Sequence, residues 1–235
     1  MTQIKVLISG GFNGAYDLMV PEFERADGIK VITGSGASQG SGPQTIAAQL
    51  TRGVEADVVI LSREGLSELI AAKRIIAGTD FDLARVGIGV AVPAGSAKPE
   101  IATVDGFKQA LLKARTVVVP GSTSGIWLVN ELFPRLGVAD KINVVVRPRG
   151  TDATAMLAAG EADLAVLPTS EIVYAKGVDL AGNIADEIQF MQTFSAAIVA
   201  GSQAIDASKR LIAFLTSARA AEAIRQSGME PCKAP

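Results

Sequence analysis

Short apolar runs alternate along the chain with longer segments in which apolar residues recur at helical spacing. Runs such as Ile4 to Ser9 and Ala56 to Leu61 are rich in Val, Ile and Leu, and amphipathic segments such as Glu64 to Ala72 follow them. Buried strands that alternate with helices are typical of layered α/β proteins. The pattern therefore predicts an α/β fold in which helices flank mostly parallel sheets.

The alternation gives the bounds of each predicted element. Strands are expected at Ile4–Ser9, Lys30–Thr33, Ala56–Leu61, Val86–Val92, Thr116–Val119, Asn143–Val146, Leu164–Leu167 and Ser195–Val199. Helices are expected at Ala15–Arg25, Gln44–Arg52, Glu64–Ala72, Asp105–Ala114, Ile126–Leu136, Asp152–Ala159, Ser170–Ala175, Ala207–Leu215 and Ala218–Ser227.

Two places in the pattern predict that the chain crosses between two lobes. A segment rich in Pro, Gly and Ser, residues 93–99, follows the run Val86–Val92, and such segments interrupt regular elements. A second crossing is expected near Gln189–Ser195, after the loop Gly177–Gly182. We expect one lobe from residues 1–84 with 194–235, and the other from residues 85–193.

Composition excludes several classes of function. The chain of 235 residues has 22 Lys and Arg against 24 Asp and Glu, a formal net charge of -2, so a basic surface for nucleic acid is not expected. Cys232 is the one cysteine, and neither a CxxC pair nor zinc-ligand spacing occurs. We therefore expect no metal site and no cofactor.

The chain contains no histidine, which removes Ser-His-Asp and Cys-His catalysis together with most imidazole acid–base chemistry. An enzyme with this sequence would depend on carboxylates, hydroxyls, Lys, Tyr or backbone dipoles. The glycine-rich loops also fail the spacing of the dinucleotide and P-loop motifs. Residues 36–40 match GxSxG, but that nucleophile motif requires a histidine elsewhere in the chain.

No apolar run approaches the roughly 18 to 20 residues that a membrane-spanning helix needs, so we do not expect the protein to be embedded in a membrane. The first residues lack the features of a secretory signal. A periplasmic location is expected if a signal was removed, and a cytoplasmic one if the chain is complete. We expect a monomer.

Small and hydroxylated residues follow nearly every predicted strand, where ligands bind in open α/β sheets. In the first lobe these candidate ligand-binding residues are Gly11, Phe12, Asn13, Ser35, Ser38, Ser41 and Ser62. In the second lobe they are Ser122, Thr123, Ser124, Arg149, Gly150, Thr151, Thr169 and Ser170.

Each of these residues has a structural explanation beside the functional one. A single Ser or Thr before a helix is commonly an N-cap that accepts a hydrogen bond from an otherwise unpaired amide. Phe12 is either a wall for an organic ligand or a core side chain. Several helix N-termini that converge, however, offer free N–H groups and positive dipole ends to an anion. The pattern thus predicts a site for a small oxyanion or carboxylate.

The order of these segments resembles a known family. A Ser- and Gly-rich second loop precedes Gly53-Val54-Glu55-Ala56-Asp57, and a Gly-Ser-Thr loop precedes Gly160-Glu161-Ala162-Asp163. The chain is similar to the molybdate-binding proteins and their relatives, the type II periplasmic binding proteins of ABC transporters. The resemblance implies a fold of two lobes that close over a small anion and an ABC permease as partner.

The resemblance also implies positions for the anion's donors, and this sequence departs from two of them. The hydroxyl after the first strand falls on Gly11 and a tyrosine falls at about Pro168, whereas the second loop, Ser62 and Gly150 keep their counterparts. Arg149 stands where an acidic residue is usual. Loss of a hydroxyl and a phenol with gain of a guanidinium favours a larger di- or tricarboxylate over molybdate. Arg149 either grips one carboxylate of that ligand or is a solvated surface charge.

Two functions remain open. The first is a substrate-binding protein that delivers an anion for ABC-type transport. The second is a cofactor-independent isomerase, because some proteins that resemble this family isomerise aconitate by proton transfer, which requires a base. Candidate bases near the loops are Glu171 and Asp152, although each also suits a helix N-terminus electrostatically or as a cap.

Overall fold

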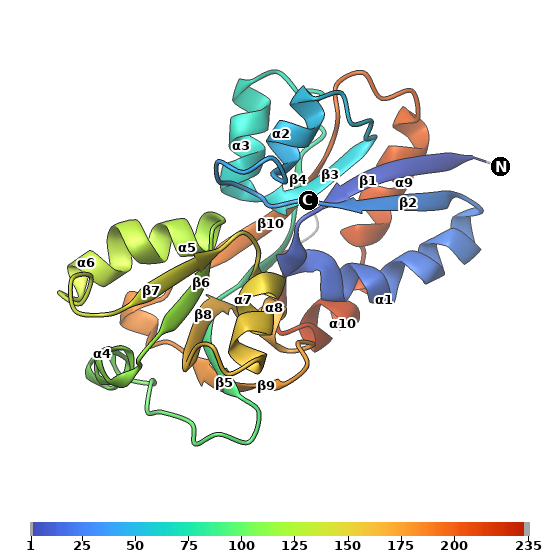
Figure 1. The fold of residues 1–235 in the computed structure, drawn as a ribbon. Coiled ribbons are helices and arrows are strands. Elements are labelled where there is room, and N and C mark those ends of the chain that lie inside the picture. The colour runs from blue at the N-terminus through green and yellow to red at the C-terminus, as the bar shows by residue number, and fades with distance from the viewer. Residues whose placement is uncertain (1, 233–235) are drawn as a thin grey trace. The chain divides into compact units, whose positions relative to one another are not determined.

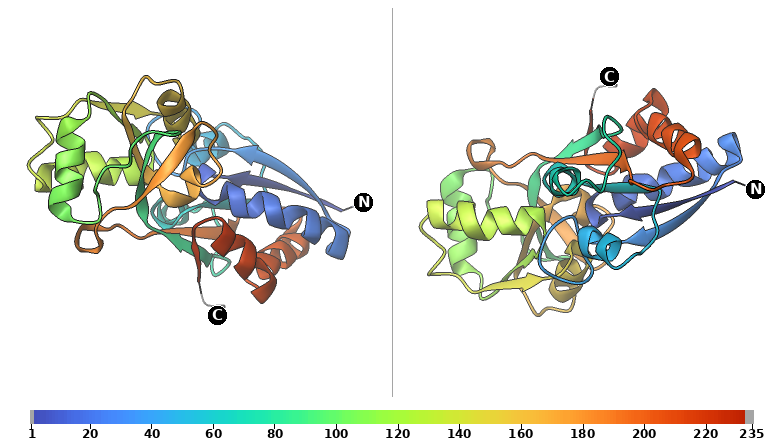
Figure 2. Two further views of the ribbon diagram at one scale, coloured as in Figure 1. Left: turned by 90° about the horizontal axis from the view of Figure 1, so that it is seen from below. Right: turned by 90° about the horizontal axis from the view of Figure 1, so that it is seen from above.

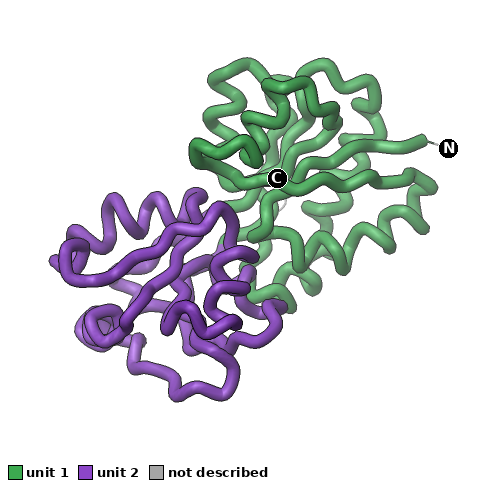
Figure 3. The backbone as a smooth tube through the Cα atoms, in the orientation of Figure 1, with its two compact units in different colours: residues 1–85, 193–235 green, residues 86–192 purple. Residues whose placement is uncertain are grey.

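The structure is a computed structural model, and it describes residues 2–232. The chain forms two compact units (Figure 3). Unit 1 contains residues 1–85 and 193–235, and unit 2 contains residues 86–192. The chain passes from unit 1 to unit 2 once and returns once, so unit 1 is built from both ends of the sequence.

Unit 1 contains a six-stranded mixed sheet in the order β11-β4-β10-β3-β1-β2. The strands β1, β2, β3, β4 and β10 are labelled in Figure 1. The central strand β1 pairs in parallel with β2 and with β3, whereas β10 runs antiparallel to β3. The short strand β11 is antiparallel to β4. The strands are β1 (Gln3–Ile8), β2 (Lys30–Ser35), β3 (Val58–Ser62), β4 (Phe81–Val86), β10 (Gln192–Ile198) and β11 (Glu230–Pro231).

Helices cover both faces of this sheet because apolar side chains alternate along its buried strands. Leu7 of β1 and Val59 of β3 pack with side chains of α2 and α3 in one core cluster. The first helix, α1, lies beside the last one, α10, and both can be followed in Figures 1 and 2. The helices are α1 (Gly10–Asp27), α2 (Ile46–Thr51), α3 (Arg63–Ala71), α9 (Ile205–Leu215) and α10 (Ala218–Gln226).

Unit 2 contains a five-stranded mixed sheet in the order β7-β6-β8-β5-β9. The strand β6 pairs in parallel with β7 and β8, and β5 is antiparallel to both β8 and β9. The strands are β5 (Ile88–Pro93), β6 (Val117–Pro120), β7 (Val144–Arg147), β8 (Leu164–Pro168) and β9 (Val178–Asn183).

Two separate apolar clusters cover the faces of the second sheet. Val117 and Val119 of β6 point into one cluster with α4 and the helix that starts at Thr123. Val118, between them, points into the other cluster with α7 and α8. The helices are α4 (Val104–Lys113), α5 (Thr123–Trp127), the π-helical turn η1 (Leu128–Leu132), α6 (Phe133–Arg135), α7 (Gly150–Ala158), α8 (Thr169–Ile172) and the short 3₁₀ turn η2 (Asp186–Ile188).

Side-chain hydrogen bonds link the two segments of unit 2 that lie next to the chain crossings. The side-chain amide of Gln189 donates to the carbonyl of Ile88 at 3.1 Å and accepts from the Ile88 N–H at 2.6 Å. Phe190, the following residue, stacks on Trp127 with ring centroids 5.0 Å apart and an interplanar angle of 20°. The segment that leads back to unit 1 is therefore packed against the core of unit 2.

The predicted α/β class with two sheets and flanking helices is confirmed, and the structure adds details that the pattern did not give. The sheets are mixed, because β5 and β10 run antiparallel to their neighbours. The predicted strand Val86–Val92 is divided: β4 ends at Val86 and β5 begins at Ile88. The pattern missed β4 and β9, whose polar residues give the weak alternation of strands with partly exposed side chains.

The helix predicted to begin at Ile126 starts earlier in the structure. It begins at Thr123, directly after the small residues that follow β6. Across residues 2–232 no helix is both long and apolar enough to cross a bilayer.

Candidate functional site

The parallel strands β2, β1 and β3 of unit 1 end at the same edge of the sheet. Ile8 of β1 is paired with Ser35 of β2 and with Ile60 of β3. The residues that follow these strands therefore meet at one edge, as the location of ligand sites in such sheets requires. We call this the unit 1 edge, and it consists of Ser9 to Gly11, Ser35 to Ser41, and Ser62.

Ser9 occupies the N-cap position of α1 at this edge. Its N–H donates to the Ile60 carbonyl at 2.8 Å, which fixes the residue between two strands. The side chain is 4% exposed, and its hydroxyl has no hydrogen-bond partner within residues 2–232. A buried hydroxyl without a partner is unfavourable, which makes Ser9 a candidate ligand-binding residue beside the first amides of α1.

Ser38 and Ser62 bind each other at the same edge. The Ser38 hydroxyl accepts a hydrogen bond from the Ser62 N–H at 2.9 Å, and the Ser62 hydroxyl caps α3 by accepting from the Gly65 N–H at 3.2 Å. Both serines are buried. The Ser62 amide, which the resemblance assigned to the anion, is therefore bonded inside the protein in this structure.

The remaining candidates of unit 1 are divided between surface and core. Ser35 and Ser41 are exposed. Asn13 donates to the Asp17 carboxylate at 3.0 Å within α1. Phe12 is fully buried and packs against Phe194 with ring centroids 6.3 Å apart, so it is a core side chain and not a wall of the edge. Gly11 leaves room for Phe194, because a Cβ there would lie 2.1 Å from its ring.

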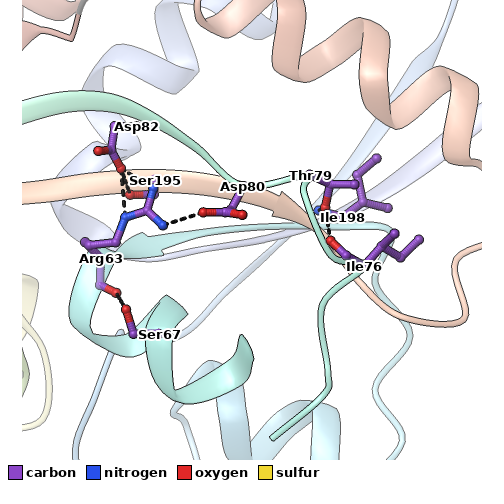
Figure 4. Close-up of polar contacts among 8 residues, drawn as sticks. All are labelled: Arg63, Ser67, Ile76, Thr79, Asp80, Asp82, Ser195 and Ile198. Atoms are coloured by element: carbon purple, nitrogen blue, oxygen red, sulfur yellow. Dashed lines mark hydrogen bonds and ion pairs between the residues drawn. The ribbon is translucent and has the colours of Figure 1, made fainter. Parts of the chain in front are cut away.

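A charged cluster fixes the segment that follows Ser62 (Figure 4). The guanidinium of Arg63 donates to Asp80 at 2.7 Å and, through Nε, to Asp82 at 2.8 Å. The same Asp82 oxygen accepts from the Ser195 hydroxyl at 2.6 Å. The start of α3 is thus joined to β4 and β10, and the positive charge of Arg63 is matched by two carboxylates.

The strands β7, β6 and β8 of unit 2 also end together. Pro120 of β6 is paired with Arg147 of β7, and Val118 of β6 with Ala165 of β8. The segments that follow these strands therefore meet at one edge of the second sheet, as they do in unit 1. We call it the unit 2 edge, and it consists of Ser122 to Ser124, Arg149 to Asp152, and Thr169 to Glu171.

The first of these segments forms the tight start of α5. Thr123 and Ser124 are buried, and Ser122 occupies the N-cap position. Gly125 must be a glycine because a Cβ at this position would lie 1.6 Å from the Pro120 carbonyl oxygen. This close approach turns the chain directly from β6 into the helix.

Thr169 and Ser170 have different roles after β8. The Thr169 hydroxyl hydrogen-bonds Asn183 Oδ1 at 2.6 Å, and the Thr169 N–H donates to the Gly87 carbonyl at 3.1 Å. Thr169 is therefore tied to the segment between β4 and β5. The Ser170 hydroxyl is buried and has no hydrogen-bond partner within residues 2–232, which makes it the counterpart in unit 2 of Ser9.

Glu171 lies against the first residue of α7. A Cβ built on Gly150 would be 1.5 Å from Glu171 Oε2 and 2.4 Å from Glu171 Cδ, so the carboxyl occupies the space that a side chain would fill. Burial raises the pKa of Glu171 from its ordinary value of 4.5 to about 7. A carboxyl with a pKa near neutrality is suited to accept and return a proton.

The other charged candidates pair with each other. Arg149 is the N-cap residue of α7, and its Nε lies 3.5 Å from Asp152 Oδ2 in an exposed i, i+3 pair. Thr151 is exposed, and its carbonyl accepts from the Thr154 hydroxyl at 3.1 Å. Asp152 is therefore a partner of Arg149, whereas Glu171 is the half-buried carboxyl that lies against Gly150 at this edge.

Ser9 is the residue that the sequence reasoning missed. The sequence pattern predicts Ser9 as the last residue of a strand, and the resemblance places the expected hydroxyl on Gly11 instead. A Ser directly before Gly10-Gly11 at the end of an apolar run is an N-cap signal that could have identified it. Over residues 2–232, no group of three or more His, Cys, Asp or Glu side chains is arranged to hold a metal ion.

Two sheets of this topology, each with helix N-termini and hydroxyls at the carboxyl edge of its parallel strands, define a type II periplasmic binding fold. Solved structures with this fold include the molybdate-binding protein of Azotobacter vinelandii, with TM-score 0.72, 18% identity and 96% and 98% of the two chains covered. The sulfate-binding protein of Mycobacterium tuberculosis has TM-score 0.75 and 22% identity over 98% of this chain and 87% of its own.

The chain belongs to the family of bacterial extracellular solute-binding proteins, whose profile matches residues 4–230. It is also similar to a protein of a Pseudomonas species that is named aconitate isomerase. The two sequences are 36% identical over 235 residues, which is 100% of this chain and 90% of the relative.

Proposed function

We propose that this protein is an isomerase that binds a tricarboxylate of the aconitate type and moves its double bond by proton transfer. The single observation that carries the proposal is Glu171, a half-buried carboxyl that lies against Gly150 at the unit 2 edge and has its pKa raised to about 7. The Pseudomonas relative named aconitate isomerase matches the whole chain and supports the same substrate class.

We propose two lobes, residues 1–84 with 194–235 and residues 85–193, each of which contributes one edge to ligand binding. Ser9 and the first amides of α1 would hold one carboxylate from the unit 1 edge. Ser170, the loop Ser122–Ser124 and the start of α7 would hold a second one from the unit 2 edge, with Arg149 as a partner for a carboxylate once it leaves Asp152. Hydroxyls and amides suit a carboxylate because they donate without adding net charge.

Glu171 would act as the base. In its ionised form it would remove a proton from the methylene carbon of cis-aconitate. The electron pair of that C–H bond would form a new double bond to the central carbon, while the π pair of the old double bond would shift onto the vinyl carbon and its carboxylate. Glu171 would then return the proton to the former vinyl carbon, which completes the shift of the double bond to the trans product. Negative charge that develops on the carboxylates in between would be stabilised by the fixed donors of both edges.

The test is direct turnover. Purified protein is incubated with cis-aconitate and the trans isomer is followed, while thermal shifts are measured with aconitate, citrate, sulfate, molybdate and tungstate. Formation of the trans isomer with a large shift for the tricarboxylates is the expected result. A shift with molybdate alone, without turnover, would overturn the proposal.

A second candidate, a receptor for ABC-type transport, is favoured by membership of the solute-binding family. In that case a carboxylate would stabilise the protein without being converted, and Glu171 would only complete the binding surface. We further propose that the protein acts as a monomer in the periplasm. Cell fractionation tests the periplasmic location. Gel filtration coupled to light scattering measures the molecular mass and so tests whether the protein is a monomer.

A further inference from the structure

Gly150 is the first residue of α7 and is buried against Glu171. Three atoms at the end of the Glu171 side chain are the nearest neighbours of a Cβ built at this glycine: Oε2 at 1.5 Å, Cδ at 2.4 Å and Oε1 at 3.1 Å. Distances below about 3 Å are far inside van der Waals contact, so the carboxyl and a side chain at residue 150 exclude each other.

The backbone does not explain why residue 150 is a glycine. Gly150 is not among the glycines with a positive φ, so its backbone conformation does not require a glycine. Gly125 of α5, by contrast, must be a glycine because a Cβ at this position would lie 1.6 Å from a backbone carbonyl oxygen. What Gly150 makes room for is the end of one flexible side chain.

From this contact we infer that Gly150 is a positioning residue for Glu171, because the absence of a side chain at residue 150 leaves the space that the Glu171 carboxyl occupies. We call this space the seat. The inference rests on the proposed function, in which Glu171 is the base. Because only the end of a flexible side chain stands in the way, alanine at residue 150 would leave the fold intact and move the carboxyl.

The seat also accounts for the environment of the carboxyl. Glu171 lies on α8, which packs against α7, β5, β8 and β9. The ionisable residues on those elements or next to α8 are Arg149, Asp152, Asp179, Tyr174 and Lys176. Burial is the cause that raises the pKa of Glu171, so a carboxyl pushed out of the seat toward water should return toward its ordinary value.

The experiment compares the Gly150→Ala variant with the wild-type protein. We expect kcat to fall about 10- to 100-fold, KM to change less than about threefold, and the acidic limb of the pH profile to move down by about one pH unit. Gly42→Ala is the matched control, because a Cβ at Gly42 meets no atom within 4 Å, and it should change none of these values.

A second measurement does not depend on activity. The Glu171 carboxyl is titrated by NMR in protein with 13C-labelled glutamate, and the Glu171→Gln variant identifies its signal. A lower pKa in Gly150→Ala, with little change in Tm, supports the inference. An unchanged Glu171 titration in a folded Gly150→Ala protein would overturn it, whereas a wild-type protein without turnover would overturn only the proposed function.

The conservative variant Glu171→Asp completes the test, since its carboxyl is withdrawn by one methylene group. The Gly150→Ala substitution should lower kcat by a smaller factor in the Glu171→Asp background than in the wild type. The shorter Asp side chain does not reach the space that a Cβ at residue 150 would fill. If the two substitutions instead combine additively, the inferred seat does not position the carboxyl.

Discussion

The two edges are built alike but differ in what their polar groups do. At the unit 1 edge the groups are neutral, and two of the three buried serines are bonded to the protein itself, Ser38 to the amide of Ser62 and Ser62 to the amide of Gly65. At the unit 2 edge an ionisable carboxyl, Glu171, is half-buried and lies beside a helix N-terminus. Among the residues that the structure describes, each edge has one buried hydroxyl without a hydrogen-bond partner, Ser9 in unit 1 and Ser170 in unit 2.

This difference indicates a division of work between the units. Neutral groups that are fixed by their own hydrogen bonds form a rigid surface that can hold an anion without titrating near neutral pH. A buried carboxyl with a raised pKa can exchange a proton at that pH. Unit 1 would therefore mainly bind the ligand, and unit 2 would both bind it and carry out the proton transfer.

The largest effect is expected when the proposed base is removed. Glu171→Gln keeps the shape of the side chain but cannot accept a proton, so we expect kcat to fall about a thousandfold while aconitate still stabilises the protein. Glu131→Gln, at an exposed glutamate of the same unit, is the control and should keep full activity. Turnover that survives in Glu171→Gln would assign the base elsewhere.

The next effect concerns stability and pH. Because the folded-state pKa of Glu171 is raised, its protonated form favours the folded protein, and this contribution is lost as pH rises from about 4.5 through about 7. Relative to Glu171→Gln, the wild type should lose about 3 kcal/mol of unfolding free energy over that range. Urea denaturation of both proteins at several pH values measures it, and parallel pH dependences would contradict a buried, titrating Glu171.

A smaller effect is expected at the unit 1 edge. Ser9→Ala should weaken aconitate binding about tenfold, because one hydrogen bond to a charged group is lost, and the pH profile should not move. Ser208→Ala is the matched control, since Ser208 is another buried hydroxyl without a partner within residues 2–232 but lies in α9. Equal affinities for Ser9→Ala and the wild type would remove Ser9 from the site.

The smallest effect is expected for Arg149→Ala. The Arg149 side chain is exposed and already pairs with Asp152, so its loss should weaken aconitate binding only about threefold, and less at high salt. Titration of aconitate at two salt concentrations measures this. If the affinity does not change at either one, Arg149 is a surface charge and both edges bind the ligand with neutral groups.

Local patterns were enough to predict much of this architecture. Apolar runs, small residues after strands and helical spacing gave the α/β class and drew attention to the segments that the structure gathers at each edge. Strands β4 and β9 were missed because their partners in the sheet, and not their own composition, make them strands.

The contacts that distinguish the candidate residues were beyond sequence reasoning. The bond from the Ser62 amide to Ser38 joins residues 24 positions apart, and neither residue type signals it. Glu171 and Asp152 looked equivalent as carboxylates near helix N-termini. Only the close approach of Glu171 to Gly150 separates them, because it depends on how α8 packs on α7.

The stacked pair Trp127 and Phe190 has a practical consequence. The chain has a single tryptophan, Trp127, and its ring stacks on Phe190, which lies in the segment that leads from unit 2 back to unit 1. Its intrinsic emission therefore comes from one known place, so a rearrangement of that segment on ligand addition would change the spectrum of an unlabelled protein.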